Sequence, residues 1–244
     1  ATATLDHLDP FLLFDHFGSD NPDDYIKGFP MHPHRGIETV TYMISGVVSH
    51  KDSMGNSGRI HDGDVQWMTS GGGIMHEEMP QPCQREMVGF QLWVNLPADL
   101  KMTTPRYQNI VSEQIPEIIR EDGVKIRVIA GEVDGIRGPV TDIFANPTYL
   151  DISIPPNGSL SYPLERGHTV FTYVFEGEGM FGAGERRVVS PAQHAPVQHF
   201  AGNRGFWYEL THWLASFRFK LGLLKHRQQA AGQRIGKGGI VDVQ

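Results

Sequence analysis

The sequence repeats one short pattern of residues at two places that lie far apart. Residues 38–46 read ETVTYMISG and residues 169–177 read TVFTYVFEG, so that Tyr42 aligns with Tyr173. The offset is 131 residues, the difference between positions 42 and 173. A pattern that recurs at a fixed offset is typical of a duplicated structural unit. The chain is therefore predicted to contain two copies of one module.

Both copies have the residue pattern of β-strands. Apolar and polar residues alternate with a period of two in several short stretches, which predicts half-buried strands. Such stretches are residues 39–44, 64–68, 88–94, 125–129 and 148–154. Turn-forming residues separate them at the spacing seen in β-sandwiches and barrels, and before residue 210 at most a short helix over 112–120 is expected. The pattern predicts an all-β fold in which Gly46 and Gly177 form equivalent hairpin turns.

The composition of the chain indicates which partners it is not expected to bind and in which cellular compartment it is expected. The 244 residues include 21 Lys and Arg against 28 Asp and Glu, a net charge of −7, so direct binding to nucleic acid or to an anionic membrane is not expected. No apolar run approaches the roughly 20 residues that a membrane-spanning helix needs. Cys83 is the single cysteine, and the first residues lack a secretory pattern. A cytoplasmic protein is predicted, or a nuclear one in a eukaryote.

Two short motifs in the first copy have the spacing of metal ligands. Residues two apart on a strand project from the same face, which pairs His32 with His34 and His76 with Glu78. Three imidazoles and one carboxylate suit a single first-row divalent metal that keeps coordination positions open for substrate or dioxygen. Either pair alone is a weak signal, and their occurrence in one module strengthens it. Iron is the first choice, while manganese, nickel, copper and zinc stay open.

Spacing alone does not decide which carboxylate would complete the site. Glu38 shares the parity of His32 and His34, so it could reach the metal if the strand ran straight, whereas Glu78 shares the parity of His76. Both carboxylates stay open on this argument.

The second copy lacks the imidazoles of the first. At the repeat offset, Pro163 aligns with His32 and Glu165 aligns with His34. The second copy is therefore predicted to hold no metal and to have a structural role.

Other residues near the two motifs allow two interpretations. Gly71, Gly72 and Gly73 form either a flexible turn or a place where backbone passes close to a ligand. The large apolar side chains that flank the motifs are predicted to be core in most cases, with a minority lining a pocket. They are Met31, Trp67, Met75, Phe90 and Trp93.

Four segments resemble the pirin family of the cupin superfamily. They are residues 28–42 (GFPMHPHRGIETVTY), 63–68 (GDVQWM), 73–80 (GIMHEEMP) and 91–97 (QLWVNLP). The resemblance covers most of residues 5–200. It implies a bicupin, which is a pair of face-to-face antiparallel β-barrels of the jelly-roll type, with one mononuclear iron in the N-terminal barrel.

The resemblance also implies roles for individual residues. It implies that His32, His34, His76 and Glu78 are the metal ligands, with Fe(II) as the expected ion. Glu38 then lies behind them, where it would orient a ligating imidazole.

The implied activity resembles that of quercetin 2,3-dioxygenase. We expect a metal-dependent dioxygenase that takes a flavonol-like aromatic substrate and O2, with Glu78 accepting the proton of the substrate hydroxyl. The alternative is a non-enzymatic, iron-dependent redox-sensing binding protein or transcriptional coregulator, which would require a protein partner. A monomer is expected.

The predicted domains follow from the repeat and from where the resemblance ends. An N-terminal metal-binding barrel is expected over residues 1–120 and a metal-free barrel over 121–210. From about residue 200 the sequence departs from the closing segment usual in the family. Residues 211–244 are expected to form an atypical tail, with an amphipathic helix over 214–229.

Overall fold

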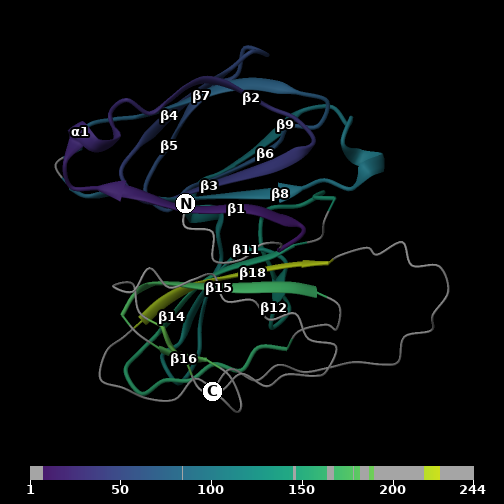
Figure 1. The fold of residues 1–244 in the computed structure, drawn as a ribbon. Coiled ribbons are helices and arrows are strands. Elements are labelled where there is room, and N and C mark those ends of the chain that lie inside the picture. Colours follow the sequence, from purple (N-terminus) through teal and green to yellow (C-terminus); the bar gives the residue numbers. More distant parts are fainter. Residues whose placement is uncertain are drawn as a thin grey trace. The chain divides into compact units, whose positions relative to one another are not determined.

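The structure, a computed structural model, is almost entirely antiparallel β-sheet in the part of the chain that it describes (Figure 1). The described residues are 8–83, 85–144, 147–163, 168–177, 179–181, 187–189 and 217–225. Contacts divide the chain into two compact units, with the boundary between Ile115 and Pro116. No helix among these residues is long and apolar enough to cross a membrane. The predicted all-β class is confirmed.

The first unit consists of two antiparallel sheets and one short helix. The five-stranded sheet has the order β1 (Phe11–Ser19), β8 (Met87–Asn95), β3 (Ile37–Ser45), β6 (Val65–Thr69) and β9 (Arg106–Ile110). The four-stranded sheet has the order β2 (Phe29–His34), β7 (Ile74–Pro80), β4 (Val48–Asp52) and β5 (Ser57–Ile60). Helix α1 (Pro22–Tyr25) follows β1 and is capped by the Asn21 side chain, which accepts a hydrogen bond from the Asp23 amide.

The second unit is built around another five-stranded sheet. Its order is β10 (Glu117–Ile119), β11 (Lys125–Ala130), β14 (Thr148–Ile154), β18 (Phe217–Lys225) and β15 (His168–Glu176). Two small ribbons pair β12 (Glu132–Val133) with β13 (Ile136–Arg137) and β16 (Gly179–Phe181) with β17 (Arg187–Val189). Short 3-10 helices cover Ala98–Leu100 and Ser112–Gln114, which belong to the first unit. The short helix expected over 112–120 is thus a 3-10 turn followed by β10.

The sequence repeat corresponds to a repeat of backbone structure. Strands β3 and β15 begin and end 131 residues apart, and so do the starts of β4 and β16. Gly46 and Gly177 follow the two repeated strands with φ values of 102° and 71°. An L side chain rarely adopts such a backbone, so glycine is favoured at both positions.

The predicted hairpins at these glycines are wrong, because neither repeated strand pairs with the strand that follows it. β3 lies in the five-stranded sheet of the first unit, whereas β4 lies in the four-stranded sheet. Gly46 therefore marks the corner where the chain crosses from one sheet to the other. A Cβ at this corner would lie 2.9 Å from the Met87 side chain.

The predicted helix over residues 214–229 is wrong for residues 217–225, which form β18. This segment reads FRFKLGLLK and places apolar residues at 217, 219 and 221, with basic residues at 218 and 220. Period-two alternation favours a strand, and β18 pairs with both β14 and β15. The rest of the predicted tail lies outside the described residues.

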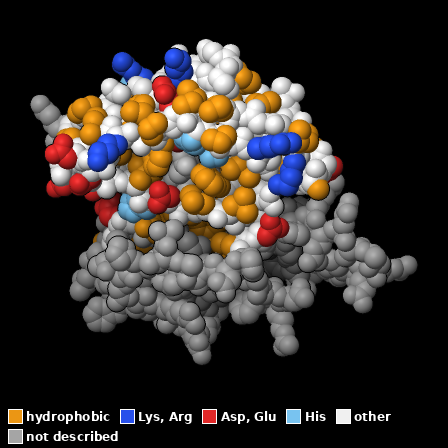
Figure 2. Space-filling model, turned by 45° about the horizontal axis from the view of Figure 1, so that its top comes forward, with side chains coloured by type: hydrophobic (Ala, Val, Ile, Leu, Met, Phe, Trp, Pro, Cys, Tyr) orange, Lys and Arg blue, Asp and Glu red, His pale blue; other side chains and the backbone are white. Residues whose placement is uncertain are grey.

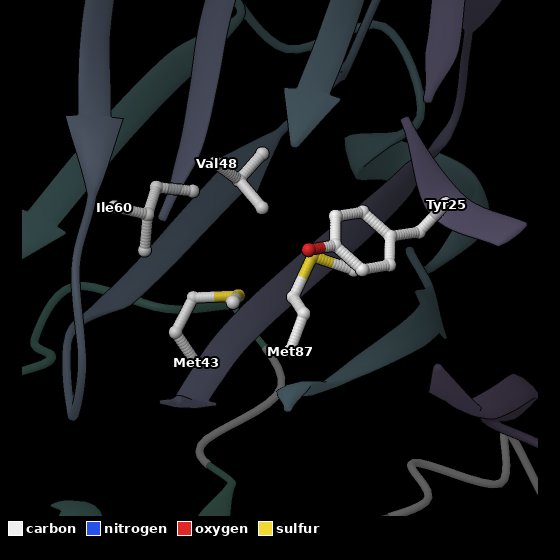
Figure 3. Close-up of a cluster of buried hydrophobic side chains, with 5 residues drawn as sticks. All are labelled: Tyr25, Met43, Val48, Ile60 and Met87. Atoms are coloured by element: carbon white, nitrogen blue, oxygen red, sulfur yellow. The ribbon is translucent and has the colours of Figure 1, made fainter. Parts of the chain in front are cut away.

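A cluster of buried side chains joins the two sheets of the first unit to helix α1. Figure 3 shows these side chains pointing toward one another from α1, β3, β4, β5 and β8. They are Tyr25, Met43, Val48, Ile60 and Met87. Their burial fixes α1 and the two sheets against each other at one end of the double sheet.

Candidate metal centre

Pairing between β2 and β7 brings three histidines together. His32 lies directly opposite His76 in this antiparallel pair, and His34 follows two residues later on the same face of β2. One ligand atom from each histidine lies within 4.8 Å of the other two. In the described ranges, these three residues form the one group of three or more His, Cys, Asp or Glu side chains that lie close enough to hold a metal ion, and Glu78 is not part of it.

The His32 ring has a fixed tautomer. Its Nδ1 lies 2.9 Å from the carbonyl oxygen of Pro30, which can only accept a hydrogen bond, so Nδ1 carries the proton. Its Nε2, which then carries no proton, lies within hydrogen-bond distance of Nε2 of His34, at 3.0 Å. Two nitrogens that bind one ion at right angles, each about 2.1 Å away, would be separated by about 3.0 Å. The pair therefore fits two ligands of a common ion, with the Pro30 carbonyl as the usual outer support.

Burial keeps two of the imidazoles neutral. Burial, followed by the nearby His76 and His32 rings, lowers the pKa of His34 to about 4. Burial, followed by the His32 ring, lowers the pKa of His76 to about 4. His76 is 1% exposed and neither of its ring nitrogens has a hydrogen-bond partner. A buried polar group without a partner costs about 1–3 kcal/mol, so a metal ion fits this donor set.

Glu78 lies two residues after His76 and faces the interior between the two sheets. Its Oε1 accepts a hydrogen bond from Thr41 Oγ1 at 2.8 Å, and its Oε2 accepts one from Gln91 Nε2 at 2.7 Å. The Gln91 amide is in turn oriented by Trp93, whose Nε1 donates to Gln91 Oε1 at 2.9 Å. Two side chains of the five-stranded sheet therefore fix the carboxylate.

The structure places Glu38 away from the histidines. Thr41 of β3 faces Glu78, so Glu38, which has the opposite parity, projects from the other face of that strand. Its Oε1 accepts a hydrogen bond from Thr69 at 2.7 Å, while Oε2 is buried without a partner, and burial raises its pKa. The expectation that Glu38 orients an imidazole is wrong, because the chain bends at Gly36 (φ 68°) between β2 and β3 and parity is not carried across.

Two site residues escaped the sequence reasoning. In the pairing of β4 with β7, His50 lies opposite Glu78 and Asp52 lies opposite His76. Both side chains are buried. Their His-x-Asp spacing repeats that of His76-x-Glu78, and this was the available signal.

The His50 ring is packed tightly and incompletely hydrogen-bonded. Its Nδ1 is buried without a partner, and burial lowers its pKa although Glu78 and Asp52 oppose the shift. Its Nε2 lies 2.7 Å from where a Cβ at Gly58, its partner on β5, would be. A side chain at position 58 would therefore have to displace this ring.

The loop after β4 fixes Asp52. Its Oδ1 accepts hydrogen bonds from the amides of Met54 and Asn56, and its Oδ2 accepts one from the Asn56 side chain. Burial alone would raise the pKa of Asp52, but these hydrogen bonds outweigh it and lower the pKa. Asp52 is therefore a charged residue that supports the loop beside His76.

The apolar residues expected near the site fall into three groups. Trp67 and Phe90 are fully buried, whereas Met31 and Met75 are 41% and 44% exposed. Trp93 packs edge-on against His34 with ring centroids 5.0 Å apart. Figure 2 shows histidine side chains reaching the surface among hydrophobic side chains.

The glycine run before β7 serves the protein backbone. Gly71 has a φ of 46°, and a Cβ there would collide with the carbonyl oxygen of Thr103. The Gly72 amide donates a hydrogen bond to the same oxygen at 2.8 Å. The close approach that glycine permits is therefore to residues 102–103.

Comparisons with known proteins agree with this geometry. The family model described as Pirin matches residues 1–94. A putative quercetin 2,3-dioxygenase of Pseudomonas aeruginosa is 46% identical over 187 residues, which cover 75% of this chain and 65% of that protein. One of Thermoplasma acidophilum is 44% identical over 179 residues, covering 66% of this chain and 69% of that protein. The chain thus spans less than two thirds of the Pseudomonas protein.

Solved structures give the same picture. A quercetin 2,3-dioxygenase from Acinetobacter baumannii has a TM-score of 0.76 and 34% identity, covering 89% of this chain and 75% of that one. A bacterial pirin from Escherichia coli in complex with nickel(II) has a TM-score of 0.54 and 19% identity, covering 81% and 76%. The second likeness concerns the fold alone.

Proposed function

The chain belongs to the pirin family, and on that premise we propose that its first unit is a metal-dependent dioxygenase site for a flavonol-like, quercetin-type substrate. The observation that carries the proposal is that three imidazoles converge and that both ring nitrogens of His76 are buried without a hydrogen-bond partner. The names of the Pseudomonas and Acinetobacter relatives support the choice of substrate class and of O2 as co-substrate.

We assign His32, His34 and His76 as ligands of one ion and Glu78 as the fourth ligand. A carboxylate has about four lone-pair positions, so Glu78 can bind an ion and keep the hydrogen bonds from Thr41 and Gln91. Fe(II) is our first choice, and the nickel of the E. coli pirin makes nickel the main alternative. When bound, such an ion supplies a Lewis acid for the substrate hydroxyl and a path for electrons to O2.

The side chains of this unit have separate tasks in the proposed reaction. Glu78 accepts the proton of the substrate hydroxyl, and Thr41 and Gln91 hold its carboxylate in one orientation while it does so. The low pKa values of His34 and His76 keep both rings neutral at pH 7, as ligands must be. Trp93 limits rotation of the His34 ring.

One observation favours a second candidate function, an iron-dependent binding protein. Three exposed apolar side chains lie on β2 and β7 beside the histidines: Phe29 at 48%, Met31 at 41% and Met75 at 44%. A protein partner could cover them in response to the state of the metal.

Turnover and metal content together test the proposed function. The protein is loaded with Fe(II) without oxygen, its metal content is measured, and quercetin is then added under air while O2 uptake and carbon monoxide release are followed. We expect wild-type protein to consume O2 and to release carbon monoxide. We expect His34→Ala to do neither. Retained metal without turnover of quercetin would overturn the enzyme and favour the binding protein.

A further inference from the structure

A cavity of about 270 Å³ reaches Glu78 from the side of α1 and β1. Its lining includes Thr41 and Gln91, the two residues that donate hydrogen bonds to the Glu78 carboxylate. One end of the cavity is therefore a polar end at which a hydroxyl group can meet a carboxylate. This inference rests on the proposed function, in which that carboxylate accepts a proton.

Aromatic and apolar side chains line the remainder of the cavity. Phe17 and Phe29 contribute rings, and Val48 and Met87 contribute aliphatic surface from the cluster of Figure 3. The Phe29 ring also lies edge-on to the His32 ring, with centroids 6.4 Å apart. The cavity therefore adjoins the metal centre, and its walls suit a planar apolar ring.

Two further charged residues line the cavity, and one of them has a free charge. Asp24 already accepts hydrogen bonds from Ser19 Oγ at 2.7 Å and from the Asn21 side chain at 3.4 Å. The Lys27 ammonium is exposed and makes no hydrogen bond or salt bridge to any residue that the structure describes. In a chain with a net charge of −7, this lining thus presents one unpaired cation.

We propose that the cavity selects aromatic substrates that carry an anionic substituent, and that Lys27 is the residue that binds this substituent. The hydroxyl group lies toward Glu78, the ring lies along Phe17 and Phe29, and the anion pairs with Lys27. A volume of about 270 Å³ is just below the range of pockets for drug-sized ligands, about 300–1,000 Å³. One or two fused rings therefore fit inside, and a third ring would extend out of the cavity.

Two matched probes test the selection without relying on turnover. 2-Naphthol and 6-hydroxy-2-naphthoate have the same two rings and one hydroxyl, and they differ in the carboxylate. Their dissociation constants are measured by calorimetry on the full chain as purified, under anaerobic conditions. We expect Lys27→Met to weaken binding of the naphthoate about fivefold, the upper end for an exposed ion pair, and to leave binding of naphthol unchanged.

Three variants control the interpretation. Lys27→Arg keeps the charge and is expected to retain the affinity for the naphthoate. Lys51→Met removes another exposed positive charge, from β4 and outside the cavity lining, and is expected to change neither affinity. Phe29→Ala removes a wall that both probes touch, so it is expected to weaken both equally. Higher ionic strength is expected to weaken the binding of the naphthoate and to leave the binding of naphthol unchanged.

The outcomes separate this inference from the proposed function. Equal affinities of both probes in wild type and Lys27→Met, or an equal loss for both probes, would overturn the role of Lys27 even if quercetin is turned over. A selective loss in Lys27→Met would support that role even if quercetin is not turned over, and only the choice of reaction would then be wrong. Binding of neither probe by wild-type protein would overturn the inference.

Discussion

The two units carry the same repeated strand, but among the described residues only the first brings several histidines together. In the second unit, the buried Asp151 lies opposite Arg127 of β11 in the strand register, and the sequence has Pro163 and Glu165 at the repeat offset from His32 and His34. In the first unit, His76 and His50 are buried with ring nitrogens that have no partner. Three histidines that converge, one of them buried with unpartnered ring nitrogens, indicate a ligand. The repeat therefore preserves the backbone, and the chemistry lies on the neighbouring strands of one copy.

The largest expected effect comes from removing a histidine of the first unit. We expect one transition metal ion per wild-type chain and none in His76→Ala, because the remaining rings would provide too few ligands. His168→Ala in β15 and His61→Ala on the surface of the first unit are expected to keep one ion. Elemental analysis of the purified proteins measures this. Two ions per wild-type chain, or one ion per chain in His76→Ala, would contradict the prediction that the first unit alone binds the metal through these histidines.

The next effect distinguishes the two buried glutamates of the first unit. Loss of an outer support costs about 10–100-fold in metal affinity, and loss of a direct ligand costs more. We expect Glu78→Ala to weaken binding of Fe(II) by more than about 100-fold and Glu38→Gln to leave it within about threefold, since Glu38 projects away from the rings. Anaerobic titration of both variants checks this. Tight binding by the Glu78 variant and weak binding by the Glu38 variant would reverse the assignment.

The third effect concerns the corner that follows the repeated strand. Gly46→Ala would place an L residue at a φ of 102° and a Cβ 2.9 Å from Met87, and we expect a loss of about 2 kcal/mol in the free energy of unfolding. Gly55→Ala is the matched control, because its φ is 92° but no atom lies within 4 Å of the added Cβ. We expect it to cost about 1 kcal/mol. Urea unfolding measures both, and equal losses would show that contact with Met87 is unimportant.

The smallest effect is the pH dependence of the same corner. Asp62 accepts hydrogen bonds from the Gly46 amide and from Arg85. Burial alone would raise the pKa of Asp62, but these contacts outweigh it and lower the pKa. A lowered pKa means stability that is present above the unfolded value of about 3.9 and is lost as the pH falls through the folded value.

We therefore expect Asp62→Asn to cost about 0.5 kcal/mol at pH 7, since the ion pair with Arg85 is exposed. The difference from wild type should vanish in acid. At the repeat offset, Gln193 occupies the position of Asp62, so this pH dependence is expected of the first copy only. Urea unfolding at several pH values measures the difference, and a difference that is independent of pH would exclude the carboxylate as its cause.

Local periodicity predicted what is local in this structure. The alternation in β3 and β15 and the shared face of His32 and His34 follow from residues two apart on one strand, and the structure contains both. The prediction for Glu38 was wrong because it assumed that side chains keep alternating between the same two faces across Gly36. The chain leaves one sheet for another at that residue. The His-x-Asp spacing of His50 and Asp52 is visible in the sequence, but their places opposite Glu78 and His76 depend on strand pairing, which spacing along the chain does not encode.

The clearance at Gly58 has a consequence for choosing harmless mutations. Position 58 is exposed on β5, so a survey that ranks positions by solvent accessibility would treat it as tolerant. Yet the His50 ring fills the space of its missing side chain and lies opposite the buried Glu78. Even a methyl group introduced from the solvent side would have to displace that ring. A substitution at this exposed edge of the sheet would therefore move a buried side chain that lies opposite Glu78, and it would disturb the candidate metal centre.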